Sequence, residues 1–226
     1  GTERLAIQAA NAGVRRLVFV SSIGVNGATT MAVPFSEQDP PQPHSPYSMS
    51  KWEAEQRLHE IAHETGLEVV IVRPPLVYGP GAKGNFLSLL KWVKRGVPLP
   101  LGACTNKRTL VGLGNMVDLL ERCVSDPRAA GQTFLAGDAE DLSTPELIRR
   151  VASALGRRAR LIAVPPVLLR AAARAVGRGS IYEQLCGSLQ VDIGHARRVL
   201  GWEPPVSVDE ELARTAQWFA GRGAGT

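Results

Sequence analysis

Residues 47–74, YSMSKWEAEQRLHEIAHETGLEVVIVRP, contain a predicted helix that leads directly into a predicted strand. The helix is expected over 46–65, and it closes at Gly66, because glycine tolerates the left-handed conformation of helix ends. Residues 67–74 form a continuous, largely β-branched apolar run that two prolines bring to an end. Such runs are typical of strands buried on both faces, so this stretch predicts a parallel sheet covered by helices.

The rest of the chain repeats this alternation of helices and short apolar strands. Further strands are expected at 15–22, 108–113, 132–137 and 159–164, and further helices at 2–12, 84–95, 114–124 and from Ser143 or Thr144 onward. We therefore expect an α/β protein with helices on the faces of a parallel sheet.

The composition limits the classes of partner. The chain is 44% hydrophobic and 21% charged, as in ordinary globular proteins, and no apolar run approaches the roughly 18–20 residues of a membrane span. The net charge is +5, but basic residues are scattered and only 5% of residues are aromatic, which favours a small anionic ligand. The densest basic stretch, 157–178, predicts a strand and then a helix with a solvated basic face; DNA or membrane contact is the minor alternative. We expect no nucleic acid and no membrane as partner.

The cysteines indicate a compartment. Cys104, Cys123 and Cys186 are odd in number and far apart, and they form neither a C-x-x-C pair nor a zinc knuckle. A reducing environment is the simplest interpretation, so we expect a cytoplasmic protein.

Residues 59–63 read H-E-x-x-H, the pattern of zinc proteases. His59 and His63 lie one helical turn apart, but a zinc ion needs a third protein ligand. The helix ends soon afterwards, and the other histidines, His44 and His195, lie in a preceding loop and far downstream. We therefore expect no metal site and place both histidines on a partly solvated flank of the helix.

The same helix carries a second pattern, Tyr47-x3-Lys51, on one face. A lysine ammonium beside a phenol favours the phenolate, and the lysine can also bind the ribose of a nicotinamide cofactor. The tyrosine can then move a proton to or from a sugar hydroxyl while hydride moves to or from carbon. Ser22, at the end of the 15–22 strand, can donate to the same oxygen. We therefore favour catalysis by these three residues over a packed tyrosine and a solvated lysine.

Five ordered blocks extend this pattern over almost the whole chain: RRLVFVSSIGVNG, SPYSMSKWEAE, VVIVRPPLVYGPG, KRTLVGLGNMVDLL and ARRVLGWEPPVSVDEELARTAQWF. They resemble motifs of the extended short-chain dehydrogenase/reductase family, in particular its NAD-dependent nucleotide-sugar epimerases and dehydratases such as UDP-glucose 4-epimerase. The second block resembles S-P-Y-x-x-S-K-x-x-x-E, and the third resembles R-P-x-x-V-Y-G-P-G. The resemblance implies a Rossmann-like parallel sheet with helices on both faces and a small C-terminal substrate-binding part.

The resemblance also implies roles for single residues. Ser22, Tyr47 and Lys51 would be catalytic. Tyr47 and Lys51 would also touch the cofactor ribose, and Pro74 and Pro75 would lie by the nicotinamide of NAD, with NADP as the alternative.

Substrate contacts would come from Ser22, Tyr47, Asn85 and Arg108. The last two would reach the diphosphate of the substrate. A guanidinium fork suits phosphate oxygens, and Asn85 lies near a predicted helix start, where amide groups favour an anion. A surface charge and a helix cap are the simpler alternatives for Arg108 and Asn85.

Several positions depart from the family pattern. Asn26 stands where the family usually has Tyr, and Leu76 where many epimerases have Asn. The segment 185–192, LCGSLQVD, replaces an Arg-x-Gly-Asp stretch that often clamps the nucleotide ribose. These changes leave the nucleotide and the sugar open. Ser22-Ile23-Gly24 replaces the Thr-Asp-Glu of dehydratases, which disfavours dehydration.

The 226 residues contain no strand followed by the Gly-x-x-Gly-x-x-Gly turn that holds the pyrophosphate in this family. We interpret the chain as N-terminally truncated, starting before the fifth strand and lacking roughly 90–100 residues of the family's length. Residues 1–78 and about 108–140 would form the Rossmann-like cofactor and catalytic domain. Residues 79–107 and about 141–226 would form the substrate-binding part.

The expected function is C4 epimerisation of a UDP-hexose or UDP-N-acetylhexosamine, through a transient 4-keto sugar and bound NAD, in polysaccharide biosynthesis. The alternatives are an NAD(P)H-dependent reductase of a UDP-4-keto sugar and a non-catalytic nucleotide-binding relic. The family also implies a homodimer through the helices 2–12 and 46–65.

We predict that a chain of these 226 residues binds NAD(H) weakly or not at all, because it would hold only the nicotinamide side of the cofactor. A calorimetric or fluorescence titration measures this. Tight binding would contradict the expectation.

Overall fold

The computed structural model describes residues 1–175, 177 and 179–221. The helices are α1 (Thr2–Asn11), α2 (Pro46–Thr65), α3 (Gly84–Arg95), α4 (Leu113–Ser125), α5 (Thr144–Ala154), α6 (Pro166–Ala175), α7 (Gly179–Cys186), α8 (Gly194–Leu200) and α9 (Val208–Gly221), with the short 3-10 helices η1 (Ile23–Val25) and η2 (Pro127–Ala129). The strands are β1 (Arg16–Val20), β2 (Glu68–Arg73), β3 (Leu76–Tyr78), β4 (Arg108–Gly112), β5 (Thr133–Leu135) and β6 (Asp141–Leu142). Within these ranges, no helix has the length and apolar character needed to cross a bilayer.

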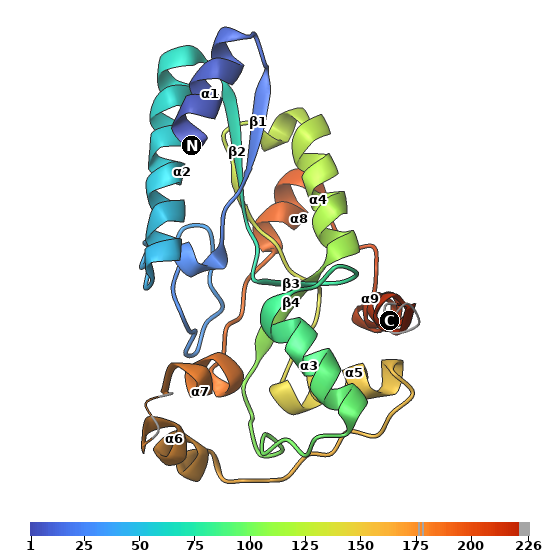
Figure 1. Cartoon of the computed structure of the whole chain (residues 1–226). Coiled ribbons are helices and arrows are strands. Elements are labelled where there is room, and N and C mark those ends of the chain that lie inside the picture. The colour runs from blue at the N-terminus through green and yellow to red at the C-terminus, as the bar shows by residue number, and fades with distance from the viewer. Residues whose placement is uncertain (176, 178, 222–226) are drawn as a thin grey trace.

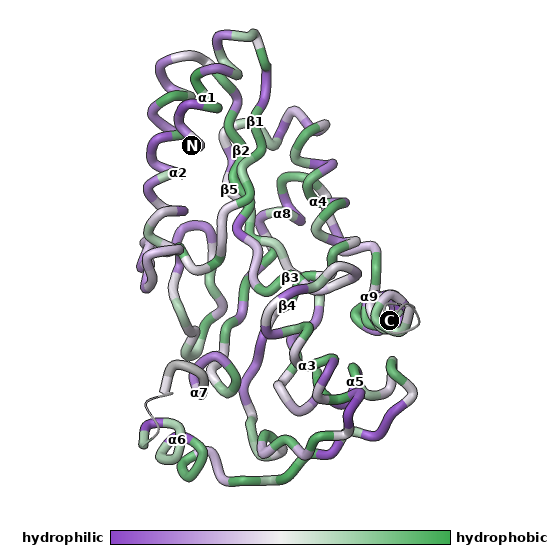
Figure 2. The backbone as a smooth tube through the Cα atoms, in the orientation of Figure 1, coloured by the Kyte–Doolittle hydropathy of each residue, from purple (hydrophilic) through white to green (hydrophobic). Residues whose placement is uncertain are grey.

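The first sheet is parallel, with the strand order β1-β2-β5. Helices α1 and α2 lie side by side on one face of this sheet, and α4 and α8 lie on the other (Figure 1). Alternate residues of β2 serve the two faces: Val69 and Ile71 pack with α1 and α2, whereas Val70 and Val72 pack with α4 and α8. Figure 2 shows apolar strands enclosed by more polar helices. The structure therefore confirms the expected α/β fold with helices on both faces.

A second, smaller sheet has the order β3-β4-β6, with β3 and β4 parallel and β4 and β6 antiparallel. Its core joins these strands to α3, α5 and α9 through buried residues that include Tyr78, Phe86, Leu90, Leu110, Ile148, Val151 and Leu212. Only two prolines separate β2 from β3, so the two sheets follow each other directly in the chain.

Most predicted elements are present, and the errors concern short strands. The expected strand at 159–164 is wrong: in that segment only Leu161 makes an isolated bridge, to Leu99. The segment holds Arg160 and follows Arg157 and Arg158, and its backbone mostly runs without a partner strand. The two- and three-residue strands β6 and β3 were not predicted, because such short runs carry no periodic signal.

Helix α2 begins and ends where its local sequence directs. The Ser45 side chain accepts a hydrogen bond from the Ser48 backbone N at 3.2 Å, and Ser48 Oγ accepts one from the Ser45 backbone N at 2.9 Å. This reciprocal capping box, with Pro46 in the first turn, fixes the helix start. At the other end Gly66 has a φ of 75°, which a side chain would strain.

A buried ion pair joins α2 to β2. Arg73 donates to the two carboxylate oxygens of Glu55 at 3.0 and 2.5 Å, and the side chains are 6% and 0% exposed. Ser21 Oγ donates to the same carboxylate. The third arm of the guanidinium donates to Asn26 Oδ1 at 3.0 Å, and Asn26 in turn donates to the Ser36 carbonyl at 2.8 Å. The network ties the carboxyl ends of β1 and β2 to the middle of α2.

Replacing Glu55 by Gln should lower the free energy of unfolding by about 3 kcal/mol, because it leaves the Arg73 charge buried without its counter-ion. Urea denaturation followed by circular dichroism measures this. Glu53→Gln, on an exposed position of the same helix, is the matched control and should change stability by less than about 0.5 kcal/mol. Equal midpoints for the two variants would show that the ion pair does not stabilise the fold.

Candidate active site

The predicted acid/base pair lies in the first turns of α2. Lys51 Nζ donates to the backbone carbonyl of Val20, the last residue of β1, at 2.9 Å. The same nitrogen lies 5.9 Å from the centroid of the Tyr47 ring and 4.7 Å from that of Phe19. Tyr47 is 61% exposed, so the ring is accessible to a ligand. The four-residue spacing thus gathers a phenol and an ammonium on one face, at the end of β1.

Ser22 lies close to the start of α2. It is the N-cap of η1, and its Oγ accepts a hydrogen bond from the Gly24 backbone N at 3.1 Å. A Cβ atom added at Gly24 would lie 3.1 Å from Ser48 Cβ and 3.3 Å from Ser22 Oγ. The serine hydroxyl and the turn of α2 that carries Tyr47 are therefore neighbours across this glycine.

Pro74 and Pro75 are buried at the junction of β2 and β3. The backbone N of Ile23 donates to the Pro74 carbonyl at 2.9 Å, which joins the segment after β1 to the segment after β2. In α/β sheets, ligands bind outside the carboxyl ends of the strands. The prolines, Ser22 and Lys51 all lie at that edge.

The groups at this edge fit part of a nicotinamide dinucleotide. The Lys51 ammonium and the Tyr47 hydroxyl can hydrogen-bond the hydroxyls of a ribose, and the buried prolines make the adjoining end of β2 apolar. The donor set matches the nicotinamide-ribose half of the cofactor.

Tyr78 does not compete with Tyr47 for the acid/base role. Its hydroxyl is enclosed and donates to Asp138 Oδ2 at 2.8 Å. Asp138 also accepts bonds from the Gly112 backbone N at 3.0 Å and from Asn115 Nδ2 at 2.6 Å. Burial raises the pKa of Tyr78 strongly and also raises the pKa of Asp138. This cluster joins β3 to the start of α4 and has a structural role.

The H-E-x-x-H histidines lie apart from this edge. His59 and His63 are both exposed on the outer side of α2. Over the described part of the chain, no group of three His, Cys, Asp or Glu side chains is arranged to hold a metal ion.

The two predicted diphosphate ligands lie in the second half of the molecule. Asn85 is the second residue of α3 and is exposed. Arg108 begins β4 and is half-buried, and this burial lowers the pKa of its guanidinium. One amino group of Arg108 donates to the Gln184 carbonyl at 2.6 Å and to the Gly187 carbonyl at 3.3 Å. The guanidinium is thus anchored on the end of α7.

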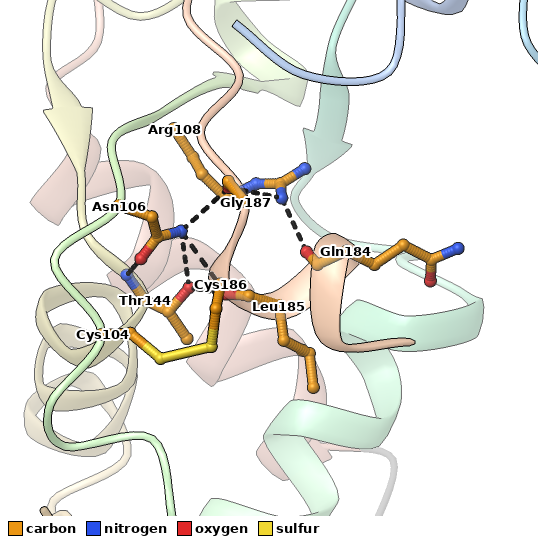
Figure 3. Close-up of a disulfide and its surroundings, with 8 residues drawn as sticks. All are labelled: Cys104, Asn106, Arg108, Thr144, Gln184, Leu185, Cys186 and Gly187. Atoms are coloured by element: carbon orange, nitrogen blue, oxygen red, sulfur yellow. Dashed lines mark hydrogen bonds between the residues drawn. A yellow bond between two sulfur atoms is a disulfide. The ribbon is translucent and has the colours of Figure 1, made fainter. Parts of the chain in front are cut away.

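A second side chain and a disulfide hold the same turn (Figure 3). Asn106 Nδ2 donates to the Gly187 carbonyl at 3.2 Å and to Thr144 Oγ1 at 3.1 Å. Cys104 and Cys186 form a disulfide with a Cα–Cα distance of 5.6 Å. Sequence reasoning missed this arrangement: the cysteines are 82 residues apart and were interpreted as unpaired, and nothing in the spacing indicates their contact.

Comparison with known proteins gives three kinds of match. A model of the NAD dependent epimerase/dehydratase family matches residues 1–137. A UDP-glucose 4-epimerase of Vibrio cholerae is 45% identical over 221 residues, which are 97% of this chain and 67% of that protein. A UDP-glucose 4-epimerase of Mycolicibacterium smegmatis is 32% identical, again over 97% of this chain and 67% of the relative.

Solved structures share the fold. The dTDP-glucose 4,6-dehydratase of Streptomyces venezuelae, with NAD bound, has a TM-score of 0.77 and 27% identity, over 99% of this chain and 66% of that one. The UDP-glucose 4-epimerase of Thermotoga maritima has the same TM-score at 22% identity, over 98% of this chain and 68% of that one. The chain thus spans about two thirds of the length of these proteins.

We predict that the native, oxidised chain shows no reactive thiol at pH 8, because Cys104 and Cys186 are paired and burial raises the pKa of Cys123 to about 12. Titration with Ellman's reagent should find one thiol after unfolding and three after unfolding with a reductant. Three thiols in the unfolded, unreduced protein would refute the pairing.

Proposed function

Because the chain belongs to the NAD dependent epimerase/dehydratase family, we propose that it is a nucleotide-sugar epimerase that inverts C4 of a UDP-hexose or UDP-N-acetylhexosamine. The observation that carries the proposal is the grouping of Tyr47, Lys51 and Ser22 at the carboxyl ends of β1 and β2. The name of the 45% identical Vibrio cholerae relative, UDP-glucose 4-epimerase, supports the nucleotide and the reaction.

In the proposed mechanism Tyr47 removes the proton of the C4 hydroxyl. Lys51 stabilises, through its charge, the Tyr47 phenolate that takes this proton, and it hydrogen-bonds the ribose of the cofactor. Ser22 donates a hydrogen bond to the same sugar oxygen and holds it in line with Tyr47. A bound NAD would supply the hydride acceptor for C4 and the hydride donor for the return step. The 4-keto sugar turns over between these two steps, so that hydride returns to the other face of C4, and Tyr47 returns the proton to the C4 oxygen.

Substrate binding is proposed for Arg108 and Asn85. A guanidinium with an amino group fixed on carbonyls keeps further N–H donors for the oxygens of a diphosphate. Asn85, exposed in the first turn of α3, can donate to the same group. In this proposal residues 79–107 and about 141–226 form the substrate-binding part, and residues 1–78 and about 108–140 form the catalytic part.

A one-way reductase of a UDP-4-keto sugar is the second candidate. The segment 185–192 favours it, because it departs from the ribose-clamping pattern of the epimerases. The stoichiometry separates the two reactions: an epimerase consumes no net NAD(P)H, whereas a reductase consumes one per sugar.

We also propose a homodimer through α1 and α2. The proposal is supported by the exposed apolar side chains of Leu5 and Ile7 on α1, which are 61% and 40% exposed, and by the half-buried Trp52 on α2. His59 and His63 would lie at the edge of this interface and need no metal there. A strict monomer in analytical ultracentrifugation would contradict the proposal.

Replacing Tyr47 by Phe should lower the turnover of UDP-glucose to UDP-galactose by about two to four orders of magnitude, because it removes only the proton-transferring hydroxyl. The measurement is a coupled assay with added NAD, on the protein expressed from the complete reading frame.

The control for this variant is its own stability. Because the Tyr47 side chain is 61% exposed, the melting temperature should stay unchanged, so lost turnover reports chemistry and not folding. Normal turnover of the Phe variant would remove Tyr47 from the mechanism.

A further inference from the structure

We propose that Cys104, Asn106 and Cys186 form a redox-sensitive clamp that holds the last turn of α7 and thereby positions Arg108 for the diphosphate of the substrate. The inference rests on the proposed function, since it takes Arg108 as a phosphate ligand. It adds a modification site, a disulfide that reacts with dithiols, and a positioning residue, Asn106, to that function.

The disulfide fixes the end of α7. Cys186 is the last residue of this helix, and Cys104 lies in the loop that leads into β4. Their Cα atoms are 5.6 Å apart, within the usual range of disulfides, and Cys104 is only 5% exposed. The bond therefore joins the loop before Arg108 to the turn on which Arg108 is anchored.

Asn106 holds the same turn by hydrogen bonds. Its Nδ2 donates to the carbonyls of Leu185 and Gly187, at 3.4 and 3.2 Å, which flank the disulfide cysteine. Its Oδ1 accepts a bond from the Thr144 backbone N at 3.1 Å, which ties the group to the start of α5. Asn106 is 5% exposed, so these bonds are shielded from water.

Arg108 depends on the carbonyls that the clamp holds. Its NH1 group donates to Gln184 and Gly187, one residue on either side of the Leu185–Cys186 pair. Helix α7 packs chiefly on α6, and no residue of α6 is buried. The two cores therefore do little to hold α7, and the disulfide and Asn106 tie the anchor of Arg108 to the loop before β4 (Figure 3). The disulfide is the covalent restraint on this turn.

Reduction opens the covalent part of the clamp. A dithiol, such as dithiothreitol or the active-site pair of a thioredoxin-like protein, supplies two electrons and two protons. The Sγ–Sγ bond of the protein breaks, two thiols form, and the dithiol becomes a disulfide. In the reduced state only hydrogen bonds hold the turn: those of Asn106, the bond from Thr144 Oγ1 to the Leu185 carbonyl, and the backbone pairing of Leu189 with Lys107 and Thr109. Without the covalent bond, Arg108 regains conformational freedom. Disulfides in reducing compartments are usually catalytic or redox-sensing, so in such a compartment this bond would act as a switch.

The test compares ligand affinities of the oxidised and the dithiothreitol-reduced chain. UDP carries a diphosphate and uridine carries none, so only UDP binding should depend on Arg108. We expect reduction to weaken UDP binding about tenfold and to leave uridine binding unchanged, measured by calorimetry and by NMR titration respectively. A loss for both ligands, or for neither, would overturn the proposal.

Three variants sharpen the test. Cys104→Ser should have the reduced affinity for UDP without any dithiol, whereas Cys123→Ser, at the buried free thiol of α4, should keep the full response to reduction. Asn106→Asp keeps the acceptor for the Thr144 backbone N and loses the bonds that Nδ2 donates to Thr144 Oγ1 and to the two carbonyls, so it should weaken UDP binding in the oxidised state as well. A UDP affinity of Asn106→Asp equal to that of the wild type would remove Asn106 from the clamp.

A second readout does not depend on any ligand. Hydrogen exchange of the backbone amides of residues 184–189 should become faster on reduction, while that of β2 stays constant. Unchanged exchange at 184–189 overturns the clamp, whatever UDP does. Arg108→Ala tests the proposed function separately: if this variant binds UDP like the wild type, the assignment of Arg108 fails, and exchange alone then decides whether the clamp exists.

Discussion

The ion pair between Glu55 and Arg73 is the constraint on which the catalytic side of the molecule depends. Two charges without solvent are stable only while they remain together, so α2 and the carboxyl end of β2 cannot separate without a large cost. Tyr47 and Lys51 precede Glu55 at intervals of four residues on the same helix, and they therefore share its orientation toward the sheet. Ser21, the neighbour of Ser22, donates a hydrogen bond to the Glu55 carboxylate. Ser22 is therefore one residue from this ion pair, and Lys51 and Tyr47 are one and two helical turns from Glu55.

Much of this arrangement is predictable from the sequence, because it rests on local signals. Buried strands reveal themselves by unbroken β-branched runs, and α2 by its proline, its serine caps and Gly66. Five ordered sequence motifs also indicate the family of the chain. The role of the residue at position 26 depends on tertiary contact: the amide of Asn26 completes the hydrogen bonding of Arg73, which no spacing rule would indicate.

Apart from the short strands β3 and β6, the unpredicted features involve partners distant in sequence. Cys104 and Cys186 are 82 residues apart, and the contact of Asn106 with the end of α7 spans a similar distance. The strand expected at 159–164 failed for a related reason, because an apolar run becomes a strand only where another strand offers its backbone. Sequence patterns describe which faces are apolar, whereas tertiary pairing decides what those faces meet.

The anchor of Arg108 consists of backbone carbonyls, and every residue type supplies a carbonyl. The side chain at position 184 can therefore change without removing the acceptor atom, whereas Gly187 is fixed, because a Cβ atom there would clash with the Glu183 carbonyl oxygen. The exposed side chains of such a segment can differ between relatives while the position of the Arg108 guanidinium stays the same. A surface that contacts different sugars or bases would need this property. The segment LCGSLQVD departs from the family pattern in its side chains, yet its backbone still supplies a carbonyl acceptor to Arg108.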